Sequence, residues 1–314
     1  MSRQRKRKGD PVHGWLAIDK PLDVSSTQVV GRLKRLFNAQ KAGHGGTLDP
    51  LANGILPIAF GEATKTAQWA MDCDKEYVFT VEWGSSTASQ DKEGEVLATS
   101  DVRPSKAEIE AALPDFMGDI QQVPPKYSAI KIDGERAYDL ARDGETFEIP
   151  SREVTVYEVE LVAIPDPDHA TIRVVSGKGF YVRAMARDLA TALGAEGHVS
   201  QLRRTRVGAL DETLALTLEQ LEALADDQDA LRNKLMPLQT VLDDVPALEI
   251  DASDRAMIKQ GRDIVLLPHL VEQWRSETDA DPDNRLAMTL CDGLAVALGE
   301  VRAGRFKPSR VFQL

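Results

Sequence analysis

A single carboxylate, Asp49, lies in the most distinctive segment of the chain, residues 43–57, which reads GHGGTLDPLANGILP. The glycines permit positive φ angles and the close approach of a second backbone or of a ligand. Pro50 lacks a backbone N–H and restricts Asp49, the residue before it, to extended or turn conformations. We therefore expect a stiff loop that presents one acid outward, with His44 close by. The alternative is an ordinary turn whose aspartate caps a helix.

One carboxylate is enough for chemistry at the anomeric carbon of a sugar, because an adjacent anion stabilises or captures a centre with oxocarbenium character. An aspartate with its ordinary pKa of about 3.9 is charged at neutral pH. A carbohydrate-acting hydrolase would need a second catalytic carboxylate in an equivalent motif, and the sequence shows none. The segment also lacks the third glycine of a dinucleotide motif, and no Gly-Lys-Ser/Thr follows it.

All of residues 43–57 resembles the catalytic loop of the TruB family of tRNA pseudouridine synthases. The resemblance implies that Asp49 is essential and that the protein isomerises uridine to pseudouridine in the T-loop of tRNA, at position 55. The reaction breaks the N1–C1′ bond and joins C1′ to C5, so we expect no cofactor. The target base must leave its stack to reach the acid. Attack on the sugar, addition to the base and abstraction of a sugar proton all remain open as the role of Asp49.

The same resemblance implies three residues that bind the flipped nucleotide. Tyr77, at the head of a predicted strand, would stack on the target base, a contact worth about 1–3 kcal/mol. Leu202 would line the uridine pocket. His44 would occupy the space from which the nucleotide departed.

Tyr181 and Arg183 belong to a second cluster, which reads SGKGFYVR. The resemblance implies that both residues meet Asp49 in space. If a strand runs this far, alternation places their side chains on one face. An arginine opposite a buried aspartate would keep the carboxylate ionised and oriented.

Four further cations are candidates for support of the site or for contact with RNA. Lys20 lies in an Asp-Lys-Pro sequence that resembles a family element next to the catalytic loop. Lys65 follows the strand after the loop. Arg203 and Arg204 lie in a basic predicted strand and are candidates for contact with phosphates.

Short strands and helices must position these residues. A helix is predicted from Ser25 or Ser26, as the N-cap, to about Asn38, and capping boxes that begin at Ser105 and Thr217 predict two more. Strand composition or alternation is found in residues 14–18, 55–60, 75–83, 155–161, 170–175 and 199–206.

The predicted fold is α+β, with the mixed, mostly antiparallel central sheet and flanking helices of the pseudouridine synthase fold. Residues 1–12 would form a basic disordered tail and residues 13–240 the catalytic domain. Residues 121–152, rich in Pro, Gly and charge, would form a thumb-like insertion that grips RNA, with a short helix at 138–142. Residues 247–314 would form a small β-rich, PUA-like domain, in which Asp292-Gly293 predicts a hairpin turn.

Positive charge is concentrated in two windows, although the formal net charge is −12. Residues 1–50 contain ten Lys and Arg against four Asp and Glu, and residues 171–210 contain seven against two. Screening limits the reach of a charge to about 10 Å, so a locally basic face can bind RNA on an acidic protein. A second hypothesis is therefore an RNA-binding helper of tRNA folding in which catalysis is secondary.

The remaining composition points to a cytoplasmic protein; the resemblance implies that it acts on tRNA, and we expect a monomer. The two cysteines, Cys73 and Cys291, are far apart, which favours a reducing compartment over a disulfide framework. Neither lies in a metal-ligand cluster and the five histidines are scattered, so we expect no metal. No run approaches the roughly 18 apolar residues of a membrane span, and no apolar segment of a secretory signal follows the basic N-terminus.

Overall fold

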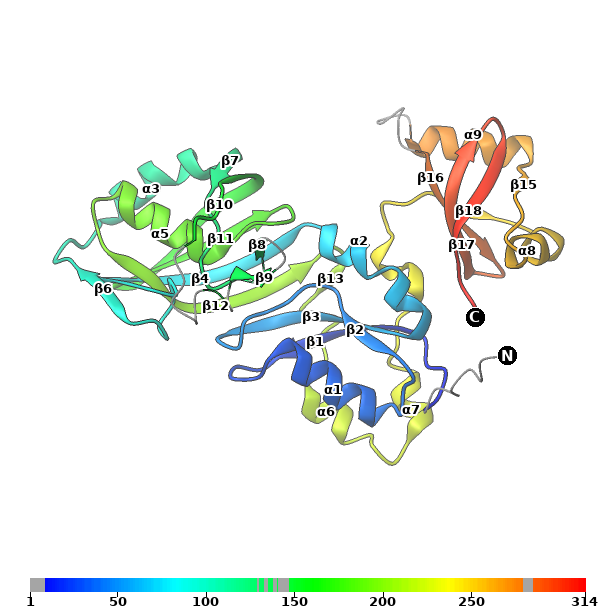
Figure 1. The fold of residues 1–314 in the computed structure, drawn as a ribbon, viewed down its shortest axis with the longest axis horizontal. Helices are drawn as coiled ribbons and strands as arrows, with labels where there is room; N and C mark the ends of the chain where they lie inside the picture. The colour runs from blue at the N-terminus through cyan, green and yellow to red at the C-terminus, as the bar shows by residue number, and fades with distance from the viewer. Residues whose placement is uncertain (1–8, 129, 133–134, 138–139, 141–146, 279–284) are drawn as a thin grey trace.

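The computed structural model describes residues 9–314 apart from 129, 133–134, 138–139, 141–146 and 279–284. A large sheet with helices on its faces is joined to a smaller β-rich module at the C-terminal end (Figure 1). The predicted α+β class is confirmed. Residues 1–8 of the expected tail, and most of the short helix expected at 138–142, lie outside the described residues.

Nine strands form the central sheet, whose main path runs β1-β3-β12-β4-β11-β10-β7, with β2 paired to β3 and β13 to β12. Their bounds are β1 Gly14–Lys20, β2 Ala42–His44, β3 Ala52–Phe60, β4 Lys75–Trp83, β7 Gly118–Gln122, β10 Arg152–Asp166, β11 His169–Ser176, β12 Gly197–Val207 and β13 Leu210–Asp211. Neighbouring strands are antiparallel except β3 and β12, which pair in parallel. This parallel pair brings β12 beside the start of β3, and therefore beside the loop that carries Asp49.

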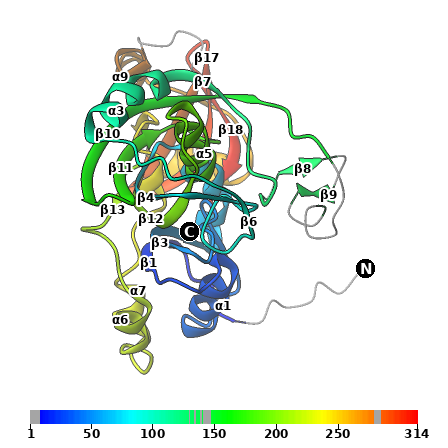
Figure 2. The same cartoon turned by 90° about the vertical axis from the view of Figure 1, so that its left-hand side faces the viewer.

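Two groups of helical elements pack on the sheet (Figure 2). The elements are α1 Ser26–Leu36, η1 Gly61–Lys65, α2 Ala67–Asp72, α3 Lys106–Ala112, η2 Leu113–Phe116, α5 Val182–Ala192, α6 Leu218–Glu222, α7 Gln228–Arg232 and η3 Leu238–Val241. α3 and α5 share a core with β4, β10, β11 and β12. α1, α6 and α7 share another with β1 and β3, in which Leu33 and Ile58 are fully buried.

The helix starts predicted from capping patterns are confirmed. Ser25 caps α1 in a capping box with Gln28, and Thr217 caps α6 in the same way. Ser105 and Glu108 form the third box, at the start of α3. Each box satisfies backbone N–H groups that have no partner within the helix.

The folded part begins earlier than the predicted boundary at residue 13. The Asp10 N–H donates to the Asn38 carbonyl at 2.7 Å, and Val12 is buried in the core around α1. Residues 9–12 therefore pack against α1 and the central sheet and do not belong to a disordered tail.

Five strands form a separate sheet in the C-terminal module, in the order β14-β16-β17-β18-β15. The elements are β14 Ala247–Glu249, α8 Ala252–Lys259, β15 Ile264–Val265, α9 Pro268–Thr278, β16 Leu286–Cys291, β17 Leu294–Arg302 and β18 Arg305–Val311. Asp292 and Gly293 join β16 to β17 with φ angles of 53° and 72°, as a two-residue hairpin turn of the predicted kind requires.

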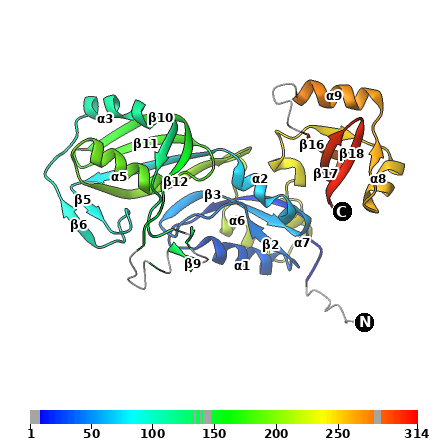
Figure 3. The ribbon, with the colours of Figure 1, turned by 45° about the horizontal axis from the view of Figure 1, so that its top comes forward.

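The module does not have a wholly separate core. Phe312 and Leu298 are fully buried in one cluster with Trp15 and Ile55 of the central sheet. Figure 3 shows the module with β16, β17 and β18 next to the end of the central sheet that carries α2 and α7. A second cluster, around Phe306, belongs to the module alone. The two sheets are thus joined by continuous apolar packing.

Two short strand pairs extend from the main sheet. β5 Ser85–Thr87 pairs with β6 Val96–Thr99, and β8 Lys131–Ile132 pairs with β9 Glu135–Arg136. The second pair belongs to the segment 121–152 that we expect to act as a thumb, of which only part is described.

Candidate active site

Asp49 lies in the turn between β2 and β3, and its side chain is 46% exposed. The loop can close because Gly54 has φ +98°, and a Cβ there would lie 2.2 Å from the Arg204 carbonyl oxygen on β12. Gly46 has φ +124°. The loop therefore presents the acid outward, as its glycines and Pro50 predict.

Helix α1 holds the loop from one side. Ser26 Oγ accepts a hydrogen bond from the Leu48 N–H and donates one to the Leu48 carbonyl, both at 2.9 Å. Both residues are buried. The residue just before Asp49 is therefore fixed by one side chain from the first turn of a helix.

Lys20, at the end of β1, supports the next part of the loop. Its fully buried Nζ donates to the carbonyls of Val24 at 2.7 Å and Pro21 at 2.8 Å, with a longer contact of 3.4 Å to Pro50. Burial lowers the pKa of the Lys20 ammonium to about 8, against the opposing effect of Asp49. Of the two roles expected for Lys20, the geometry matches support and leaves no surface for RNA.

Arg204, on β12, lies behind the loop. Its Nε donates to the Ile55 carbonyl at 2.8 Å, and its two terminal nitrogens donate to the carbonyls of Thr47 at 3.3 Å and Gly46 at 3.2 Å. The side chain is 2% exposed, and burial lowers the pKa of its guanidinium, which the nearby Tyr77 side chain opposes. The expectation that Arg204 contacts phosphates is therefore wrong, since its donors are turned into the protein.

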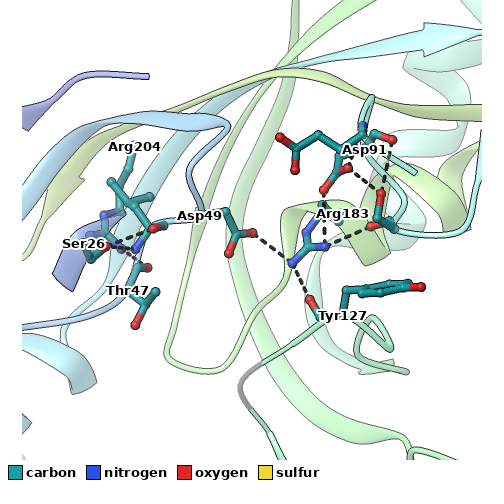
Figure 4. A network of polar contacts seen from close by, with 10 residues as sticks. Ser26, Thr47, Asp49, Asp91, Tyr127, Arg183 and Arg204 are labelled. Atoms are coloured by element: carbon teal, nitrogen blue, oxygen red, sulfur yellow. Dashed lines mark hydrogen bonds and ion pairs between the residues drawn. The ribbon is translucent and has the colours of Figure 1, made fainter. Parts of the chain in front are cut away.

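Arg183 forms the ion pair with the acid. Its Nη2 lies 2.9 Å from Asp49 Oδ2, and its Nη1 lies 3.4 Å from Asp91 Oδ2. The carbonyls of Ser89 and Tyr127 accept its other hydrogen bonds, at 2.9 and 2.8 Å. Figure 4 shows the guanidinium between the two carboxylates. At 7% exposure the Arg183 side chain is buried, whereas its partner Asp49 remains partly exposed.

The strand does not run as far as Tyr181 and Arg183, so the condition under which alternation would place them on one face is not met. β11 ends at Ser176, and after Gly177 and Gly179 the chain turns into α5, with Tyr181 as the N-cap residue and Arg183 in the first helical turn. The two glycines end the strand, and Gly179 has φ +86°. The two side chains still reach one cavity, but a helix start brings them there.

A cavity of about 380 Å³ opens beside Asp49, a size within the range of small-ligand sites. Of the predicted site residues it is lined by Asp49, Tyr77, Tyr181, Arg183, Leu202 and Arg204. Tyr77 and Arg204 are cross-strand partners, and so are Leu202 and Phe79, which fixes their positions on β4 and β12. The sheet thus forms the floor of the cavity and the loop forms one wall.

Tyr181 is held in the opposite wall. Its backbone N–H donates to Gln122 Oε1 at 2.8 Å and its carbonyl accepts from Gln122 Nε2 at 3.1 Å. The Arg152 guanidinium lies over the Tyr181 ring, 4.9 Å from the ring centre.

His44 does not line this cavity. It lies on β2, and its buried Nδ1 has no hydrogen-bond partner among the residues that the structure describes. Burial, followed by the charge of Arg204, lowers the pKa of the imidazole, so the ring is neutral at neutral pH.

Lys65 and Arg203 lie away from the cavity. Lys65 Nζ is 2.6 Å from Glu62 Oε2 and donates to the Val311 carbonyl at 2.8 Å, so it joins the C-terminal module to the catalytic domain. Arg203 forms ion pairs with Asp19 at 3.0 Å and Glu212 at 2.6 Å.

The second basic window, residues 171–210, is largely neutralised within the protein. Arg173 alone contacts Glu76, Glu158 and Glu160, and Lys178 contacts Asp72 at 3.4 Å. With Arg183, Arg203 and Arg204 also engaged, the window is not the free basic surface that its composition suggests.

Several residues of the site could not be found from the sequence. Ser26, Gln122 and Arg152 are remote in the chain from residues 43–57, and only the fold brings them together. Lys75, buried and lining the cavity, has its pKa lowered to about 8 by burial.

Within the described ranges there is no group of three or more His, Cys, Asp and Glu that could hold a metal ion. No helix of these ranges is long and apolar enough to cross a membrane.

Known proteins match the chain over its length. The N-terminal domain model of TruB family pseudouridylate synthases matches residues 34–182, and the tRNA pseudouridylate synthase B C-terminal domain model matches residues 183–243. The tRNA pseudouridine synthase B of Caulobacter vibrioides is 54% identical, with 99% of both chains covered, and that of Agrobacterium fabrum is 49% identical, with 99% of this chain and 98% of that one covered.

The fold is also similar to one in the crystal structure of a Cbf5-Nop10-Gar1 complex, with a TM-score of 0.72 over 99% of this chain and 91% of that one, at 24% identity. That likeness concerns the fold. The similarity to the two bacterial relatives extends over almost the whole sequence. The chain belongs to the TruB family of pseudouridylate synthases.

Proposed function

We propose that this protein isomerises uridine to pseudouridine in the T-loop of tRNA, at position 55, as a cytoplasmic monomer. The observation that carries the proposal is the Asp49–Arg183 ion pair of 2.9 Å beside a cavity that Tyr77 and Leu202 line. The cavity combines aromatic rings, among them Tyr77, aliphatic side chains, among them Leu202, and one oriented acid. These are the groups that a flipped pyrimidine nucleotide requires.

Asp49 acts at the sugar or the base of the flipped nucleotide. Arg183 holds one oxygen of its carboxylate in place, while the exposed part of the side chain remains free for the substrate. Tyr77 stacks on the base and Leu202 excludes water beside it. The geometry is compatible with attack on C1′, addition to the base and removal of a sugar proton.

The reaction needs preorganisation more than it needs added groups, because atoms are rearranged within one nucleotide. Contacts from Lys20 to the Pro50 carbonyl, from Arg204 to the Ile55 carbonyl and from Ser26 to the Leu48 carbonyl fix the loop before the substrate arrives. A carboxylate that is held in place has no reorganisation cost when positive charge develops on the sugar. The partly described thumb-like segment and the PUA-like module would supply further contacts with tRNA.

The test is conversion of unmodified tRNA, followed by chemical mapping of pseudouridine. We expect wild-type protein to modify the T-loop uridine and Asp49→Asn to lose activity by several orders of magnitude while it still binds tRNA. Asp101→Asn, which alters an exposed carboxylate in the segment before α3, should retain full activity. Normal turnover by Asp49→Asn would refute the proposal, and accelerated tRNA folding without any modification by wild-type protein would favour the folding helper.

A further inference from the structure

The cations that line the cavity differ in how many of their N–H groups already form hydrogen bonds within the protein. The four are Lys75, Arg152, Arg183 and Arg204. Arg183 donates to two carboxylates and two carbonyls, and Arg204 donates to three carbonyls. Lys75, 7% exposed, donates to the carbonyls of Met71 at 2.8 Å and of Cys73. These three hold the protein together and have little left for a ligand.

Arg152 is different. It is the first residue of β10, where the partly described thumb-like segment rejoins the sheet. One terminal nitrogen donates to the Gly179 carbonyl, and Cζ of the guanidinium lies over the Tyr181 ring. Its Nε is buried and has no hydrogen-bond partner among the described residues, where it also forms no ion pair with a carboxylate.

A buried N–H of a charged group that lacks an acceptor destabilises the folded protein by about 1–3 kcal/mol or more. Such a group is a candidate to form a hydrogen bond with a bound ligand. Two contacts fix the position of the Arg152 guanidinium before a ligand binds. The Tyr181 ring lies against the guanidinium, and Gly179 lies close to it, with a Cβ there only 3.6 Å from Arg152 Cζ. An oriented planar guanidinium with spare donors matches the oxygens of a phosphate.

We infer that Arg152 binds a phosphodiester group of the RNA, adjacent to the nucleotide that enters the cavity. The inference rests on the proposed function, because a flipped nucleotide brings its own backbone phosphates to the rim. It extends that function by a phosphate subsite in the wall opposite Asp49. Lys178, in the same turn as Gly179, is not among the residues that line the cavity, and its Nζ lies 3.4 Å from Asp72 Oδ1.

The first test is the salt dependence of tRNA binding. Each phosphate contact to a single-stranded segment contributes about 0.7 to the slope of log K against log salt. We expect Arg152→Gln to reduce the slope by about 0.7 and to weaken binding about tenfold at low salt, whereas Arg152→Lys, which keeps the charge, retains most of the slope. Loss of affinity with an unchanged slope in both variants would mean that Arg152 only supports Tyr181, and would overturn the inference.

The second test uses wild-type protein and therefore does not depend on a variant that folds. A methylphosphonate replaces one backbone linkage at a time in a T-arm RNA, on either side of the target uridine. One neutral linkage should weaken binding by wild-type protein about tenfold and should have no further effect on Arg152→Gln. Equal sensitivity of both proteins at every linkage would show that Arg152 contacts no phosphate.

Arg275→Gln is the matched control, because it removes the same group from an exposed position on α9. It should leave the salt slope, the affinity and the response to neutral linkages unchanged. If wild-type protein forms no pseudouridine, the proposed function fails. If it forms pseudouridine but Arg152→Gln keeps the wild-type slope, only the phosphate subsite fails.

Discussion

The charged groups around Asp49 are stabilised in different ways. Arg183 faces two carboxylates, whereas Lys20 and Arg204 donate chiefly to backbone carbonyls. A carbonyl offers partial charge only, so burial dominates and the pKa values of Lys20 and Arg204 fall. The positions of these cations around the loop are therefore maintained at a cost in stability, which the fold tolerates because they fix the loop.

Lys20 makes this cost measurable. Its pKa is about 8 in the folded protein against 10.5 in the unfolded chain, so between these values the unfolded state binds more protons and the free energy of unfolding rises with pH. Lys20→Met removes this contribution, while Lys75, whose pKa is also about 8, acts equally in both proteins. Urea unfolding at pH 7.5 and 9.5 should show a larger gain with pH for wild-type protein than for the variant. Equal gains would contradict the prediction.

At the scale of elements, capping patterns and alternation were sufficient for most helices and strands. α1, α3 and α6 begin where their capping boxes predict, and β16 and β17 meet at Asp292-Gly293. How far the strand before Tyr181 continues was left open, because local composition does not show it; in the structure Gly177 and Gly179 redirect the chain after Ser176.

The candidate site was predictable only in part. The loop, Tyr77 and Arg183 could be named from the sequence because they lie in recognisable motifs. The direction of the Arg204 guanidinium could not be predicted, because the sequence of a basic strand is the same whether its side chains face solvent or backbone carbonyls. Long-range contacts such as Arg152 over Tyr181 depend on the order of the strands, which residue types do not specify.

Two adjacent serines at the start of helix α1 make different contacts, and their substitution should therefore have different effects. Ser26 binds both backbone groups of Leu48, and Ser25 caps the helix without touching the loop. Ser26→Ala leaves a buried N–H and a buried carbonyl unpaired, at about 1–3 kcal/mol, and loosens the residue before Asp49. We expect kcat to fall about tenfold with little change in KM.

Ser25→Ala is the matched control, since loss of an N-cap costs about 1 kcal/mol of stability. It should lower the midpoint of thermal unfolding while kcat stays within about twofold of wild type, by single-turnover measurement on unmodified tRNA. If both variants lose activity in proportion to their loss of stability, α1 affects activity only through folding. The contact between Ser26 and Leu48 would then have no separate effect on catalysis.

At the scale of the whole molecule, residues 310–313 connect the sheet of the C-terminal module to the central sheet. Phe312 is buried among side chains of both sheets, and its carbonyl accepts from Lys259 at 2.5 Å. The Gln313 N–H donates to Glu62 Oε2 at 2.8 Å, and the Arg310 guanidinium lies 5.1 Å from the ring centre of Trp69. Because apolar packing and polar contacts coincide here, the module and the catalytic domain should unfold as one unit.

Phe312→Ala should break this coupling. Removal of a fully buried phenylalanine costs about 3–5 kcal/mol, and here the loss falls on packing that both sheets share. Calorimetry should show one transition for wild-type protein and two for the variant. Phe306→Ala deletes an equally buried ring from the core that belongs to the module alone, so it should lower the midpoint of a single transition. A single transition for Phe312→Ala, at the midpoint of Phe306→Ala or above it, would show that the contact does not couple the two sheets.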